Sequence, residues 1–64
     1  MYVIERLDRP GYFYEPEDRN FHSELSGLFK TYRYHSTALR AAGALAKRSG
    51  VRVRVTTLSI GSPK

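Results

Sequence analysis

The sequence predicts a small α+β fold in which one main α-helix packs on a mostly antiparallel sheet. Three observations support this: an N-terminal β-hairpin pattern, helical spacing of alanine and leucine over residues 36–49, and strict alternation of valine with polar residues over residues 51–56. A short helical turn precedes the main helix, and a C-terminal strand completes the sheet. With 64 residues, we expect a single domain, residues 1–64, with a thin core.

The first segment, residues 1–15, is expected to form the hairpin. β-forming residues occupy positions 2–4 and 12–14. Between them, Pro10 presets φ for the second turn position and Gly11 accepts a positive φ at the third, which describes a type II turn. Because type II is not the preferred two-residue hairpin turn, we expect a slightly longer loop.

The middle segment, residues 16–35, is predicted to hold an acidic loop, a helical turn and a short extended piece. The loop is expected over residues 15–20, which are polar and mostly acidic. Apolar residues at helical spacing predict a helical turn near residues 23–28. Alternation over residues 31–34 predicts the extended piece.

Residues 36–49 are predicted to form the main helix. Ser36 is expected to be the N-cap, and Gly50 the glycine that ends the helix. The face predicted to be buried consists of Ala38, Leu39, Ala42, Leu45 and Ala46, with Ala41 at its edge.

The last strand is predicted over residues 51–60, with its valines toward the core and its arginines on the other face. Leu58 and Ile60 have the opposite parity. This predicts either a bulge near residues 56–57 or a strand that passes from one layer to another. Residues 61–64 are expected to be a frayed tail.

Charge is unevenly distributed along the chain, whose net charge is +5. All six acidic residues lie within the first 24 positions, whereas only basic residues are charged from Leu25 onward. This pattern favours an anionic partner for the second part, or a dipolar surface that orients a protein partner. The alternative is that the two parts neutralise each other in the folded chain.

Catalytic and cofactor signatures are not found in the sequence. There is no cysteine, and two histidines alone argue against structural zinc, so neither a metal nor a cofactor is expected. His22 is either a general base oriented by Glu24 or a half-exposed loop histidine, and His35 is expected to pack at the start of the helix. We therefore expect that the chain is not an enzyme.

Membrane insertion is not expected either. No apolar run approaches the ~18 residues needed to span a bilayer, and the N-terminus becomes charged too early for a signal peptide. A cytoplasmic protein without membrane contact is the resulting expectation.

Tyrosine and arginine, which are enriched at binding hot spots, supply the candidate binding surface. This surface comprises Tyr12, Tyr14, Tyr32, Arg33, Tyr34, Arg40, Lys47, Arg48, Arg52 and Arg54. Basic residues beside tyrosine rings also suit single-stranded nucleic acid. If the helix and the strand turn their cations to opposite sides of the sheet, the basic surface divides and a protein partner is favoured.

The order of features resembles small uncharacterised proteins encoded by bacteriophages and prophages. The resemblance rests on the hairpin, the stretch from Leu25 to Phe29, the stretch from Ser36 to Leu39 that opens the alanine-rich helix, and the stretch from Gly50 to Val53. It implies a non-enzymatic accessory protein in the cytoplasm of a bacterial host cell, which binds a host protein and modulates or inhibits it. A small basic nucleic-acid-binding module and a homo-oligomeric accessory protein remain the alternatives.

Overall fold

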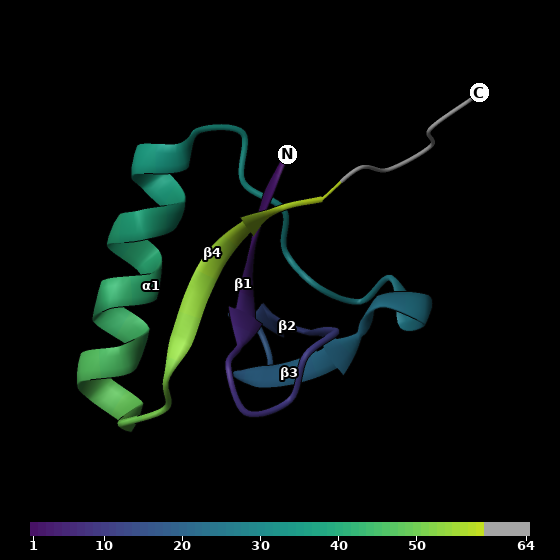
Figure 1. The fold of residues 1–64 in the computed structure, drawn as a ribbon, viewed down its shortest axis with the longest axis horizontal. Coiled ribbons are helices and arrows are strands. Elements are labelled where there is room, and N and C mark those ends of the chain that lie inside the picture. The colour runs from purple at the N-terminus through teal and green to yellow at the C-terminus, as the bar shows by residue number, and fades with distance from the viewer. Residues whose placement is uncertain (59–64) are drawn as a thin grey trace.

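The structure, a computed structural model that describes residues 1–58, is a four-stranded antiparallel sheet with one long helix on one face (Figure 1). The elements in chain order are β1 (Tyr2–Arg6), β2 (Tyr12–Glu15), β3 (Asn20–Ser23), the short 3-10 helix η1 (Glu24–Ser26), α1 (His35–Ser49) and β4 (Val53–Thr57). The strand order is β3-β2-β1-β4, so the first strand of the chain is central. The predicted α+β class, with its hairpin, helix on the sheet and final strand, is confirmed.

The β1–β2 connection has the predicted turn. Gly11 has a φ of 88°, and the Tyr12 amide donates to the Arg9 carbonyl at 3.2 Å. Pro10 and Gly11 therefore occupy the two central positions of a turn that needs positive φ at the third residue.

Strand β3 was not predicted, because its residues were assigned to the acidic loop and the helical turn. It pairs with β2 through Tyr14 and Phe21, and through Phe13 and His22. Phe21 is the one strong β-former in this strand, so the local signal is weak and the pairing with β2 decides the structure. The predicted helical turn is present in a shorter form, η1.

The extended piece predicted over residues 31–34 is reduced to one bridge. Tyr2 and Tyr32 exchange backbone hydrogen bonds of 2.8 and 2.7 Å. The Lys30 amide donates to the Tyr14 carbonyl at 3.2 Å. Residues 30–32 therefore lie beside both β1 and β2.

The helix α1 begins one residue earlier than predicted. Its N-cap is Tyr34, whose side chain makes no capping hydrogen bond, so the prediction of Ser36 as N-cap is wrong. The ring of His35 packs on Tyr2 with centroids 5.1 Å apart, which holds the first turn against the sheet. The helix ends as predicted, because Gly50 adopts a φ of 76° and donates to the Ala46 carbonyl at 2.8 Å.

The face of the sheet toward α1, here called the helix face, carries the main core. Alternation places the side chains of Ile4, Tyr14, Phe21 and Val55 on this face. The buried cluster consists of Ile4, Tyr14, Tyr32, Ala38, Ala42 and Leu45. Val53 and Val55 pack against it, so the prediction that these valines face the core is confirmed.

Leu39 does not belong to the buried face, contrary to the prediction, since 51% of it is exposed. The cause is the position of α1 over the end of the sheet, where its main contacts are with β4 and β1 (Figure 1). Leu39 and Arg48 are nine positions apart, which is two and a half turns at 3.6 residues per turn. They therefore lie on opposite flanks of the helix. Arg48 lies toward β2 through Tyr14, so Leu39 lies beyond β4, the last strand of the described sheet.

Strand β4 runs regularly along β1, from Arg6 opposite Val53 to Tyr2 opposite Thr57. The predicted bulge near residues 56–57 is therefore wrong, because the regular pairing extends through these positions. The strand ends at Thr57, before the predicted end at Ile60. Residues 59–64, with the predicted strand end and tail, lie outside the described residues.

The opposite face of the sheet, here called the outer face, has a smaller set of buried side chains. Val3, Glu5 and Phe13 are buried there. Phe29 packs edge-on against Phe13, with ring centroids 4.9 Å apart. Glu5 accepts hydrogen bonds from the Gly11 amide at 2.7 Å and from Arg54 at 2.8 and 2.9 Å, so this buried carboxylate is satisfied.

Candidate functional site: an arginine-lined cleft

The predicted basic surface is divided between two sides of the molecule. Arg54 alternates with the core-facing valines of β4, so it belongs to the outer face, where it pairs with Glu5. Arg52 precedes β4 and lines a hollow together with Arg6 and Gly50. Arg40 and Lys47 lie on the side of α1 opposite its buried residues. The cations of helix and strand therefore do not converge.

Two of the predicted surface tyrosines belong to the core. Tyr14 is 5% exposed and Tyr32 is 8% exposed, so neither ring is accessible on the predicted binding surface. Burial also raises the pKa of Tyr32. Alternation along β2 places Tyr14 on the helix face, and the bridge with Tyr2 brings Tyr32 into the core cluster.

The remaining predicted aromatic and basic residues lie apart from one another. Tyr34 is 62% exposed, and the Arg33 guanidinium carbon lies 5.9 Å from the centre of its ring. Tyr12 is half-buried beneath Arg9, whose guanidinium carbon lies 4.4 Å from the ring centre. These two cation–π pairs sit before α1 and at the β1–β2 turn, so they form no joint surface.

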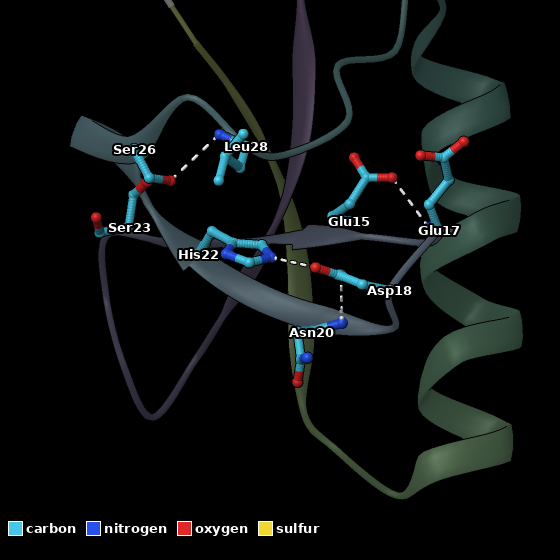
Figure 2. A network of polar contacts seen from close by, with 8 residues as sticks. All are labelled: Glu15, Glu17, Asp18, Asn20, His22, Ser23, Ser26 and Leu28. Atoms are coloured by element: carbon cyan, nitrogen blue, oxygen red, sulfur yellow. Dashed lines mark hydrogen bonds and ion pairs between the residues drawn. The ribbon is translucent and has the colours of Figure 1, made fainter.

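His22 is paired with Asp18 and not with Glu24. Figure 2 shows the His22 ring directed at the Asp18 carboxylate, with an Nε2–Oδ2 distance of 2.7 Å. The same carboxylate accepts from the Asn20 amide at 3.1 Å, and the hydrogen bond with His22 lowers the pKa of Asp18. These contacts tie the β2–β3 turn to β3.

An arginine-lined cleft lies where α1 leaves the helix face uncovered. Because α1 packs mainly on β4 and β1, its C-terminal end and the neighbouring strands border a half-open cleft of about 280 Å³. Its lining consists of Arg6, Tyr14, Arg19, Asn20, Phe21, Leu45, Arg48, Ser49 and Val51. Below, this site is called the arginine cleft.

Three elements position the arginines of the cleft. Arg6 ends β1 on the helix face, and its guanidinium carbon lies 5.2 Å from the centre of the Phe21 ring. Arg19 precedes β3 with a φ of 57°, a left-handed conformation that reverses the chain. Arg48 is in the last turn of α1 and donates to the Tyr14 hydroxyl at 3.4 Å.

The floor of the cleft is apolar and closely packed. The Tyr14 and Phe21 rings are in contact, with centroids 5.1 Å apart, and Leu45 is buried beside them. The last turn of α1 is fixed by Ser49, whose hydroxyl donates to the Leu45 carbonyl at 2.7 Å and accepts from the Val51 amide at 3.2 Å. The cleft therefore combines a packed floor with a cationic rim.

The charge in the cleft is only partly compensated. Its lining contains three arginines and no carboxylate. Asp8 binds Arg6 at 2.8 and 2.9 Å, a hydrogen-bonded pair that raises the pKa of Arg6 and lowers the pKa of Asp8. Within residues 1–58, Arg19 and Arg48 form no ion pair with a carboxylate. Anions are therefore attracted to the cleft.

Arg48 and Tyr14 belong to the predicted binding surface, whereas Arg6 and Arg19 were not predicted. Arg6 carried a detectable signal, because it continues the parity of Tyr2 and Ile4 and thus places a cation on the core side of β1. Arg19 carried no such signal, since its position depends on the β2–β3 turn.

Residues 1–58 contain no group of three histidine or acidic side chains arranged to hold a metal ion. None of their helices has the length and apolarity required to cross a bilayer.

Comparison with known proteins gives no relative: no protein-family model, no curated protein and no solved structure matches this chain. The arginine cleft is therefore interpreted from its own residues.

Proposed function

We propose that this chain is a non-enzymatic interaction protein that binds a partner protein and modulates it. The observation that carries this proposal is the division of the predicted basic surface between the helix side and the outer face. A nucleic-acid strand needs a continuous basic track beside exposed rings, whereas a protein partner needs a local patch of complementary charge. The structure offers such a patch in the arginine cleft.

The non-enzymatic part of the proposal rests on how the titratable groups are used. His22 and Asp18 hold the β2–β3 turn, and Glu5 joins the β1–β2 loop to β4. Each of these groups has a structural partner that explains its position.

The class of partner, a bacterial host protein, rests on the resemblance of the feature order to phage-encoded accessory proteins. Affinity capture from a bacterial lysate, with and without nuclease, tests it. We expect a stoichiometric protein that remains bound at physiological salt after nuclease treatment. Recovery of no protein, or loss of the captured material with nuclease, contradicts the proposal.

Nucleic-acid binding is distinguished from the proposed protein binding by its salt dependence. Displacement of counterions by a phosphate-binding face gives a steep negative slope of log K against log salt. We expect no binding of single-stranded or duplex DNA or RNA at physiological salt. A steep slope that falls in the double variant Arg52→Ala, Arg54→Ala would establish the nucleic-acid alternative instead.

Self-association through the outer edge of β4 is disfavoured by its charged side chains. Arg52 and Arg54 are exposed beside this edge, and arginine or lysine at a sheet edge opposes strand pairing between copies. We therefore expect a monomer in light scattering across a concentration series.

A further inference from the structure

We infer that the arginine cleft binds a carboxylate of an acidic segment in the partner protein, with a neighbouring apolar side chain on the floor of the cleft. This inference rests on the proposed function and names the chemistry of its contact.

The rim of the cleft suits a carboxylate. Guanidinium groups bind planar oxyanions through two parallel hydrogen bonds, and such charge-assisted bonds are about twice as strong as neutral ones. Arg19 and Arg48 are exposed and have no carboxylate partner within residues 1–58. Both are therefore available to an incoming anion.

Arg6 contributes an orienting charge. Its two hydrogen bonds with Asp8 and its position over Phe21 fix the guanidinium in one place. A fixed charge needs less ordering when a ligand arrives, which favours binding. Asp8 also reduces the charge of the three arginines from +3 to +2.

The floor adds a requirement for apolar surface next to the anion. Of the residues that line the cleft, Phe21 and Val51 are only half-buried and so offer apolar atoms to a ligand, whereas Tyr14 and Leu45 are buried. A free inorganic anion leaves this surface without a contact, whereas an acidic residue beside an aromatic or aliphatic residue covers it. The neighbouring apolar group strengthens binding by removing area from water.

The size of the cleft favours a short segment. Pockets for drug-sized ligands measure roughly 300–1,000 Å³. A cavity of about 280 Å³ lies below that range and accommodates one or two side chains. The adjoining hollow beside Arg6, lined also by Gly50 and Arg52, gives the rest of the segment a place to leave the cleft.

A nuclear magnetic resonance titration tests the assignment directly. The ¹⁵N-labelled protein is titrated with the blocked peptide acetyl-Glu-Asp-Phe-Glu-amide, with its uncharged isostere acetyl-Gln-Asn-Phe-Gln-amide, and with sodium phosphate. We expect saturable shifts of the side-chain Nε–Hε signals of Arg19 and Arg48 with the acidic peptide, and at least tenfold weaker binding of the isostere.

Three results overturn the assignment. The first is the absence of saturable shifts with the acidic peptide. The second is an equal response at Arg40, on the side of α1 opposite its buried residues, which indicates diffuse attraction to all cations. The third is tighter binding of phosphate than of the peptide at the same signals, which assigns the cleft to a free anion.

Matched variants separate the cleft from general charge. The double variant Arg19→Ala, Arg48→Ala is expected to bind the acidic peptide at least tenfold more weakly. Arg19→Lys with Arg48→Lys keeps the charge but removes the paired hydrogen-bond geometry, so it is expected to restore only part of the affinity. The control Arg40→Ala with Lys47→Ala removes two charges from the far side of α1 and is expected to change the affinity less than twofold.

Lysate capture with the same variants keeps the two proposals distinct. If the double variant captures the same partner as the unaltered protein to the same extent, the cleft assignment fails and the proposed function stands. If the peptide binds in the cleft but no partner is captured, the proposed function fails. If capture requires Arg19 and Arg48, both are supported.

Discussion

The helix face and the outer face of the sheet differ in how their charges are compensated. On the outer face, Glu5 binds Arg54 and Asp18 binds His22, so these four groups have partners within the chain. On the helix face, Arg19 and Arg48 border an apolar hollow without such partners among the described residues. The contrast indicates that the arginines have two roles here. Arg54 stabilises the fold, whereas Arg19 and Arg48 remain available to a ligand.

The largest expected effect concerns the core beneath the cleft. Leu45→Ala is expected to lower the free energy of unfolding by about 2–5 kcal/mol, because it removes a buried leucine side chain between α1 and the sheet. Leu39→Ala, on the exposed flank of the same helix, is expected to cost less than about 0.5 kcal/mol. Urea denaturation followed by circular dichroism measures both. Equal losses would contradict the placement of α1 over β4 and β1.

The next largest expected effect is a difference in unfolding free energy between variants of Arg54 and Arg48. Arg54→Ala leaves the buried Glu5 carboxylate with only the Gly11 amide, so we expect a loss of about 1–3 kcal/mol in unfolding free energy. Arg48→Ala is expected to change the unfolding free energy by less than about 0.5 kcal/mol, because it is exposed.

Binding of the acidic peptide is expected to show the reverse order, with a loss in Arg48→Ala and none in Arg54→Ala. Thermal unfolding and peptide titration of the same two proteins provide the four values. A cleft arginine that stabilises the fold as strongly as Arg54 would remove the distinction between the two faces.

The smallest effect is a pH dependence at the β2–β3 turn. The hydrogen bond with His22 lowers the pKa of Asp18 in the folded protein. A carboxyl group with a lowered folded pKa contributes stability that is present above its unfolded pKa of about 3.9 and is lost as the pH falls through the lowered folded pKa. In His22→Ala, we expect the Asp18 titration, followed by carboxyl ¹³C resonances, to shift upward. An unchanged midpoint would show that the turn backbone alone holds the carboxylate.

The sequence predicted the hairpin, the helix and the final strand because each has a strong local pattern. The Pro10–Gly11 turn, the glycine after the helix and the alternating valines depend only on residues close in the chain. Strand β3 and the start of α1 were missed because long-range contacts decide them: β3 needs the edge of β2, and His35 packs on Tyr2.

The arginine cleft shows the same limit. Arg48 was identifiable as a cation in the last turn of a helix, and Arg6 as a cation at a core-parity position. Their meeting with Arg19 depends on where α1 packs over the sheet, which is mainly on β4 and β1. Helix pattern and strand parity do not specify that position.

The central place of β1 has a consequence for how the chain folds. Tyr2 pairs with Thr57, so the two ends of the described chain must meet before β1 is covered on both sides. Closing a loop of this length is entropically costly, and chains dominated by such contacts fold more slowly than helical bundles. During synthesis on a ribosome, the hairpin can form early. The edge of β1 that pairs with β4 stays unpaired until β4 has left the exit tunnel. A truncation before β4 would therefore leave that strand edge free to pair with other chains.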